Sequence, residues 1–403
     1  MRKKILRQLA LILVLLSLSS VIYSQTSSNF SDKKEWFENF SIRGYVQVRY
    51  NRLFESNPNL GCEQCDKSWG GDGGFFIRRT RIIFSGNLNK RVYFYIQPDF
   101  ASAVSADKQH FGQLRDAYFD VSLDDKNEFR FRIGQSKVPY GFENMQSSQN
   151  RLPLDRADPT NSAVKDERDL GVFFYWAPNK IRELFSRLVK EGLKGSGDYG
   201  VFGLGVYNGQ TANREEQNLN KHVVIRFSYP VEINNQIIEP GIQAYSGKYV
   251  IASNQRSAGV KINQSNEYVD QRIAASFILY PKPFGIQAEY NIGKGPEFDK
   301  AADSITTKNV RGGYITASYV MKKKNQFVIP FCRYQYYNGG KKHELDARSY
   351  NVNDFEMGIE WQPNKNFELV TVYTFSKRRY EDFKNKNNFQ QGNLLRLQAQ
   401  INF

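Results

Sequence analysis

Residues 129–133, FRFRI, alternate apolar side chains with arginines. Successive side chains of a strand point to opposite faces, so Phe129 and Phe131 share one face and Arg130 and Arg132 share the other. In a soluble sheet the arginines would lie in bulk water. In a membrane barrel they would lie in a water-filled lumen, with the aromatic rings against lipid. The same alternation recurs along the chain, and it restricts the possible folds more than any other feature.

The first 24 residues have the features of a cleaved secretory signal peptide. An apolar run covers residues 9–22, and small polar residues around Ser24 suit a cleavage site. The run is shorter than the roughly 18–20 residues that a spanning helix needs, and no cysteine follows it, as a lipid anchor would require. We expect a signal peptide at 1–24 and a short polar lead at 25–39. The signal peptide begins with the basic residues Arg2, Lys3, Lys4 and Arg7.

Composition narrows the possible partners of the exported chain. Without the signal peptide it keeps 52 Lys and Arg against 41 Asp and Glu, a net charge of +11. Export argues against nucleic acid, so small anions and anionic lipid are the expected partners. The chain is 14% aromatic, with 24 Tyr and 30 Phe, although only 40% of it is hydrophobic. This excess fits strands that have a lipid face, a wet face and aromatic girdles.

Alternating segments continue from residue 40 to the end of the chain. We count about 16, from 40–53 to 392–403, joined by short polar turns and longer loops. No second long apolar run occurs, so membrane residence requires a closed barrel. The last segment alternates up to a terminal Phe403, which resembles the assembly signal of bacterial outer-membrane proteins. The prediction is an all-β, antiparallel transmembrane barrel over residues 40–403, wide enough for an aqueous channel.

Three other features stand outside this pattern. Residues 181–194 have helical spacing, which favours a short amphipathic helix within a connection. Cys62 and Cys65 form a CEQC motif in a Gly-rich segment. A local disulfide is the preferred interpretation, because a redox or metal site would need a second pair or a βαβ context. Cys332 is isolated, and we expect it to be lipid-facing or packed.

The parity of the arginines predicts their direction. Arg79 and Arg81 lie opposite Thr80 and Ile82, and Arg78 has the other parity, which we place near the outer end of its strand. An arginine on the lipid face costs about 2–4 kcal/mol at the bilayer midplane, so several of them must face the lumen. A guanidinium-lined lumen favours anions. The alternative is a general pore in which inward arginines only pair with acids. Arginines with inward parity also include Arg43, Arg49, Arg226, Arg272, Arg333 and Arg396.

The polar segment 138–168 follows the strand of Arg130 and Arg132. It is rich in Pro and too polar to lie against lipid, so it must extend outward into water or inward into the lumen. We predict that it folds inward and narrows the pore. A surface loop over the mouth is the alternative. The cations expected to act at the narrowest point are Lys137, Arg151, Arg156, Lys165 and Arg168.

Several of these segments resemble the phosphate-selective porin O and P family, namely FSIRGYVQVRY, FFIRRTRIIFSGNL, YFYIQPDF, LRDAYFDV, FRFRIGQSKVPYGFEN and ERDLGVFFYW. The resemblance implies a sixteen-stranded homotrimeric outer-membrane porin with an inward third outer loop and lumen arginines that guide small anions such as phosphate. By motif position, Arg79 and Arg81 match the second-strand arginines of the family. The run before the third loop is matched by Arg130, Arg132 and Lys137. Arg43 and Arg49 are assigned by parity only.

Other functional classes have weaker support. A barrel lipase needs a Ser–His pair with a polar third member, and the sequence offers only His110, His222 and His343, with no GxSxG or HExxH motif. We therefore expect no enzyme, no cofactor and no metal site. A general non-selective porin is the first alternative to an anion channel, and a surface-binding barrel without transport is the second. The expected partners are small anions, outer-membrane lipid, the barrel assembly machinery and further copies of the chain.

Overall fold

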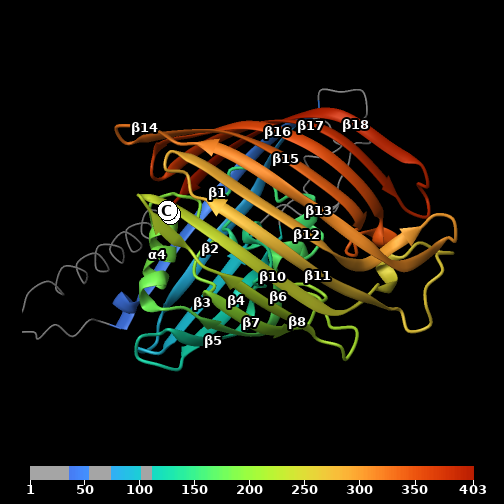
Figure 1. The fold of residues 1–403 in the computed structure, drawn as a ribbon, viewed down its shortest axis with the longest axis horizontal. Helices are drawn as coiled ribbons and strands as arrows, with labels where there is room; N and C mark the ends of the chain where they lie inside the picture. Colours follow the sequence, from blue (N-terminus) through green and yellow to red (C-terminus); the bar gives the residue numbers. More distant parts are fainter. Residues whose placement is uncertain (1–35, 54–73, 101–110) are drawn as a thin grey trace, which may run out of the picture. The chain divides into compact units, whose positions relative to one another are not determined.

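The structure, a computed structural model, describes residues 36–53, 74–100 and 111–403. The chain divides into two units, residues 1–39 and 40–403. The described part of the first unit is a short 3₁₀ helix, η1 (Trp36–Asn39). The second unit is the β-barrel drawn in Figure 1. The predicted signal peptide, Cys62, Cys65 and His110 lie outside the described residues.

The barrel closes because its first strand pairs with two neighbours. β1 (Phe40–Leu53) is antiparallel to both β2 (Gly74–Asn87) and β18 (Asn388–Asn402). β8 (His222–Ser228) and β9 (Val231–Ile233) both pair with β10, and β13 and β14 both pair with β15, so the wall has 16 strands. The predicted fold and strand number are confirmed. The remaining strands are β3 (Val92–Asp99), β4 (Gln113–Ser122), β5 (Phe129–Lys137), β6 (Arg168–Trp176), β7 (Phe202–Tyr207), β10 (Gln236–Val250), β11 (Glu267–Leu279), β12 (Phe284–Asp299), β13 (Ser304–Tyr319), β14 (Met321–Lys323), β15 (Gln326–Gly340), β16 (Ser349–Asn364) and β17 (Phe367–Glu381).

The two faces of the wall differ as the alternation predicts. In β8, Arg226 is 2% exposed and sits between Ile225 and Phe227, which are 46% and 50% exposed. The interior is therefore polar and the outer face apolar, the pattern of an outer-membrane barrel. No helix in the described part of the chain is long and apolar enough to cross a bilayer.

Aromatic side chains gather on the outer face beside the short turns. These turns include residues 281–283 and 364–366, and the neighbouring exposed rings mark one rim of the apolar band. We call this end the short-turn rim and the other end the loop rim. In bacterial outer-membrane barrels the short turns face the periplasm. The exposed aromatic residues at the short-turn rim are Phe129, Tyr229, Phe284, Tyr319, Trp361 and Phe403.

Short helices occur in the connections between strands. α4 (Asn179–Lys190) joins β6 to β7 and confirms the helix expected within 181–194. Three others lie in the connection between β5 and β6: α2 (Phe142–Met145), α3 (Asp158–Asn161) and η2 (Lys165–Glu167). The last two are η3 (Ser253–Gln255) and η4 (Leu345–Ala347).

Candidate functional site

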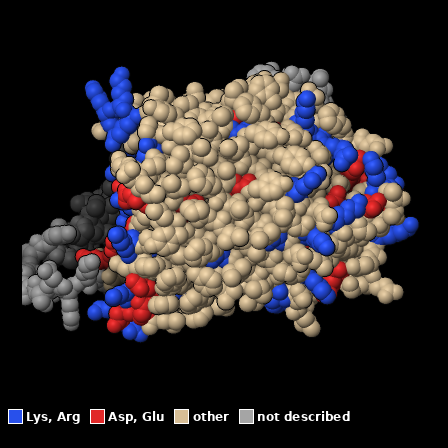
Figure 2. Space-filling model, in the orientation of Figure 1, with Lys and Arg blue, Asp and Glu red and all other residues tan. Residues whose placement is uncertain are grey.

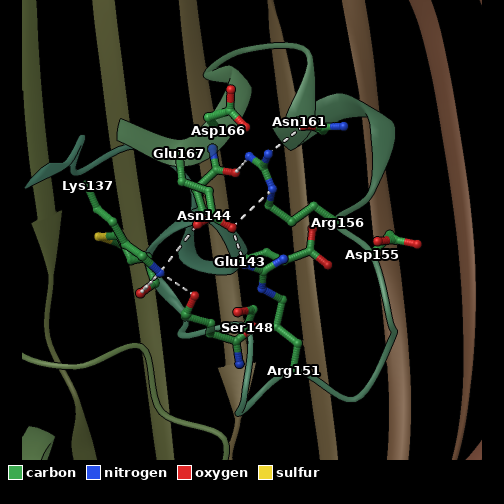
Figure 3. Close-up of polar contacts among 12 residues, drawn as sticks. Lys137, Glu143, Asn144, Ser148, Arg151, Asp155, Arg156, Asn161, Asp166 and Glu167 are labelled. Atoms are coloured by element: carbon green, nitrogen blue, oxygen red, sulfur yellow. Dashed lines mark hydrogen bonds and ion pairs between the residues drawn. The ribbon is translucent and has the colours of Figure 1, made fainter. Parts of the chain in front are cut away.

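The connection between β5 and β6, residues 138–168, lies inside the barrel, and we call it the inward segment. The backbone N–H groups of Phe142 and Glu143 donate to the two carboxylate oxygens of Glu289 on β12, at 2.6 and 2.8 Å. The N–H of Asp158 donates to Gln335 on β15, at 2.7 Å. These contacts with inward side chains of the far wall confirm that the segment folds into the lumen (Figure 3).

Arginines of the wall hold the inward segment through one carboxylate in particular. Asp155 lies 3.1 Å from Arg49 Nη1, 2.7 Å from Arg396 Nη1 and 3.7 Å from Arg78 Nη2. Arg49 and Arg396 are fully buried. A carboxylate shared by several guanidinium groups offsets the cost of burying them, because each buried charge needs a partner. Arg49 therefore serves to dock the segment.

Two further wall arginines act in the same way. Arg333 Nη1 lies 3.0 Å from Glu143 Oε1, and Arg378 Nη2 lies 3.0 Å from Asp158 Oδ2. Arg272 donates to the Pro159 carbonyl oxygen at 3.1 Å. The inward direction of Arg272, Arg333 and Arg396 agrees with their parity. What the sequence did not indicate is that these side chains bind the segment instead of lining open space.

Within the inward segment, Glu167 gathers cations. Arg151 and Arg168 pair with it, Arg156 Nε lies 3.2 Å away and Lys137 Nζ lies 3.8 Å away. Burial alone would raise the pKa of Glu167, but these four cations outweigh it and hold the pKa well below its usual range. The expected positive charge of the segment is therefore present but partly neutralised. Figure 3 shows Arg156 turned towards Glu167.

The predicted second-strand arginines lie together near Ser148 of the inward segment. Arg81 Nε lies 2.8 Å from Asp99 Oδ2, and its Nη1 donates to Ser148 Oγ at 3.1 Å. Arg79 donates to Gln47 at 2.8 Å, and its Nε has no hydrogen-bond partner. Arg79 has no carboxylate within ion-pair distance among the described residues, although its side chain is buried. It is therefore the least compensated of the buried residues among the predicted site residues.

Arg78 corrects the parity argument. The β1–β2 register shifts between Gln47 and Val48, so that Arg79 faces Gln47 while Ile77 faces Val48. Arg78 is the extra residue of this β-bulge, and a bulge redirects a side chain that simple alternation would place outside. Its guanidinium reaches Asp155, as described above. The expectation that Arg78 lies outward at the strand end was wrong.

The other predicted site residues border one cavity. Arg132 Nε lies 2.8 Å from Asp120, and Arg130 Nη1 lies 2.6 Å from Asp198. Arg43 is partly exposed, and its Nη1 donates to Ser85 Oγ at 3.2 Å. Lys137 donates to the Met145 carbonyl oxygen at 3.0 Å.

This cavity, of about 760 Å³, lies between the β1–β6 wall, residues 145–150 and α4. We call it the cationic cavity, because nine basic residues line it against three acidic ones. The acids are Asp116, Asp120 and Asp198. The bases are Arg43, Lys90, Arg91, Arg130, Arg132, Lys137, Arg168, Arg182 and Lys190.

A second element narrows the lumen from the short-turn rim. The apolar face of α4 packs Phe185 and Leu188 into a cluster with Ile278, Tyr280 and Phe142. Just after α4, Lys194 Nζ lies 2.5 Å from Glu360 Oε1 on β16, and its carbonyl oxygen accepts from Gln146 at 2.6 Å. The periodicity of residues 181–194 predicted this helix but not its place in the mouth. The available signal for that position was the apolar face of the helix, which has no apolar partner nearby in the sequence and so must pack against a distant part of the chain.

Comparison with known proteins agrees with this architecture. The outer-membrane channel DcaP of Acinetobacter baumannii has a TM-score of 0.54 and 14% identity, over 90% of this chain and 97% of that one. OmpF of Salmonella typhi, solved with daunomycin, gives 0.56 and 13%, over 90% and 97%. The anion-selective porin from Comamonas acidovorans gives 0.54 and 10%, over 90% and 99%. At these identities the similarity shows the fold alone.

Sequence comparison supplies the family. The search among curated proteins found no match. A family profile described as phosphate-selective porin O and P matches residues 62–403, most of the chain and nearly all of the barrel. The chain therefore belongs to the phosphate-selective porin O and P family.

Proposed function

We propose that this outer-membrane porin conducts small anions in preference to cations, and that phosphate is among them. The observation that carries the proposal is the cationic cavity, where nine basic residues face three acidic ones. The family and the porin fold point to a channel rather than an enzyme. The anion-selective neighbour from Comamonas acidovorans is consistent with this preference.

The physical basis is the short range at which these charges act. A single charge about 5 Å from an ion is worth about 0.8 kcal/mol in water, a factor of about four in local anion concentration. Several uncompensated charges multiply this factor, and a narrow, low-dielectric passage strengthens it. Arginine keeps its charge at every physiological pH, and its planar fork matches phosphate.

Arg79 is the candidate for a direct phosphate contact. Its Nε lacks a partner, and Arg78, Arg81 and Arg151 are near enough to interact with it electrostatically. Four guanidinium groups close together repel one another, and a phosphate between them would relieve that repulsion through charge-assisted hydrogen bonds. We infer that an anion which passes the inward segment pauses beside Arg79.

A general diffusion porin is the competing function, and ion pairing favours it. Arg81, Arg130 and Arg132 each have a carboxylate partner within 3 Å. If such pairs neutralised the whole pathway, ions of both signs would pass equally. Arg43, Lys90 and Lys190 of the cationic cavity have no carboxylate within ion-pair distance among the described residues, and this excess of positive charge argues for the selective channel.

Further features remain proposals. We propose a homotrimer, which accords with the trimeric form of the Vibrio cholerae OmpT neighbour, at a TM-score of 0.53. We also propose a signal peptide cleaved near Ser24, a short lead over residues 25–39 and insertion by the barrel assembly machinery. Chemical cross-linking in the membrane and N-terminal sequencing of the mature protein would test the first two.

The deciding experiment is the reversal potential of single channels in a KCl gradient. Wild-type protein should give the sign of an anion-preferring pore. Arg43→Gln and Arg132→Gln should each lower the anion-to-cation permeability ratio, while Lys365→Gln, at an exposed turn outside the cavity, should leave it unchanged. Arg79→Gln should weaken the block of chloride current by inorganic phosphate. A wild-type reversal potential at zero would refute the preference.

A further inference from the structure

The outer face of β12 changes character along its length. Its lipid-facing side chains begin with Phe284 at the short-turn rim and continue through Tyr290 and Ile292, which are 51% and 50% exposed. The next outward residue is Lys294. Ten residues of tilted strand separate Phe284 from Lys294, about 25 Å along the barrel axis, which is the height of the apolar band. Lys294 therefore lies where lipid tails give way to headgroups on the loop-rim side.

A second cation accompanies it on β13. Arg311 is directly opposite Ile292, and Asn309 is opposite Lys294, so the two cations are diagonal neighbours across adjacent strands. Both are exposed on the outer face, and neither has a carboxylate within ion-pair distance among the residues described. Figure 2 shows the face over β10–β18, where charged side chains are sparse in the middle and gather at both ends, the loop rim included.

Two other cations at this rim are paired with carboxylates. Lys248 Nζ lies 3.1 Å from Glu267, and Lys308 Nζ lies 3.1 Å from Asp299. Lys294 and Arg311 differ from these two lysines, because neither of them has a carboxylate partner in the part of the chain that the structure describes. An unpaired cation that borders an apolar surface is favourable where an anion from the surrounding layer can reach it.

The two cations also share a groove of about 800 Å³ on the strands β10–β15. Gln271 and Asn309 add amide groups at its polar end, while Ile273 and Ile292, 45% and 50% exposed, line its apolar end. The groove thus has a cationic end at headgroup height and an apolar end within the tail region. These two ends match the two parts of one lipid molecule, a charged headgroup and apolar acyl chains.

We propose that the groove binds a phosphorylated lipid of the outer leaflet. Lys294 and Arg311 contact its phosphate, the arginine through its planar fork and the lysine as a point charge. Ile273 and Ile292 contact the first acyl chain. The site lies on the outside of the barrel, so it is independent of the anion pathway in the lumen.

The test is native mass spectrometry of the full-length mature protein in phosphatidylcholine nanodiscs titrated with lipid A. The double variant Lys294→Gln/Arg311→Gln should bind lipid A about thirtyfold more weakly, as expected from about 1 kcal/mol for each cation. The control Lys248→Gln/Lys308→Gln removes the same charge from the same rim and should bind like wild type. Single-channel conductance verifies that each variant forms an intact barrel.

Three outcomes would overturn the proposal. Equal affinity of the groove variant and the control would show that bulk charge governs binding. If dephosphorylated lipid A bound as tightly as lipid A, the groove would not recognise the phosphate. Loss of a multimer, instead of loss of lipid, in the groove variant would assign the surface to a second copy of the chain.

Discussion

Replacing Asp155 by asparagine should weaken the docking of the inward segment on the wall. Asp155 is the common partner of Arg49, Arg396 and Arg78, at 3.1, 2.7 and 3.7 Å. The two closest guanidinium groups are fully buried, so the substitution removes from both of them a charge that compensates their burial, while Arg396 keeps its ion pair with Glu356 at 2.6 Å. Asparagine keeps the size of the side chain, so the change tests charge and not packing.

The magnitude follows from the burial of the pair. Removing one partner of a buried ion pair costs about 3–5 kcal/mol. The lower end applies here, because a lumen admits more water than a protein core. A loss of about 3 kcal/mol shifts the ratio of docked to undocked segment by a factor of about 140. The barrel wall should stay folded, since its backbone ladder does not depend on Asp155.

Single-channel recording provides the assay. Asp155→Asn should show larger mean conductance, more frequent current fluctuations and weaker discrimination between anions, because the segment no longer holds one position. Asp125→Asn is the matched control: Asp125 pairs with Arg91 at 2.7 Å but is exposed, and such a pair contributes little. Conductance and noise at wild-type values in a correctly assembled Asp155→Asn channel would refute the docking role of this carboxylate.

Three further predictions follow from other contacts. Burial raises the pKa of Asp158, but Arg378 and Lys341 lower it further, to about 2 from an ordinary 3.8. The contribution of Asp158 to docking is therefore complete above about pH 4 and lost towards pH 2. Asp158→Asn should raise conductance at pH 7, and its conductance should increase less than that of wild type as the pH falls towards 2. A variant with the wild-type pH profile would count against this. Deleting Phe403 should reduce the yield of heat-modifiable barrel, because Phe403 and Gly44 exchange two backbone hydrogen bonds, of 2.8 and 3.0 Å, at the closure; an undiminished yield would contradict this. Lys194→Gln should widen the short-turn mouth and increase conductance, since it breaks the contact with Glu360, and a conductance equal to that of wild type would show that the mouth does not limit the current.

Much of the architecture could be predicted because alternation is a local property. The side chains around Arg226 show which face of β8 meets water, and no information on any other strand is needed. The predicted ends of the strands were less accurate at the loop rim. There the alternation in the sequence predicts strands at 284–293 and 310–320, whereas β12 continues to Asp299 and β13 begins at Ser304. Above the membrane no lipid imposes alternation, so the sequence carries no pattern that marks these strand ends.

The candidate site was predicted only in part. Parity gave the inward direction of Arg49 and Arg81, and the polarity of residues 138–168 excluded contact with lipid. The bulge that turns Arg78 inward could not be recognised from the alternation. A bulge is one extra residue relative to the partner strand, so it can be identified only once the pairing of the two strands is known. The mouth-closing role of Lys194 was equally hidden, since its partner Glu360 is far away in the sequence.

The sequence by itself determined the class of fold, the number of wall strands and the face on which each regular arginine lies, because these follow from periodicity and from the cost of a charge in lipid. Only the tertiary structure decided which inward charges are used to fix the segment and which remain available to ions. Asp155 and Glu167 show the reason. The ion-pair partners of a carboxylate in a lumen are the cations that lie nearest to it. Distances across a barrel depend on register, tilt and the path of the inward segment. Those quantities arise when all the strands have closed, and no local stretch of sequence contains them.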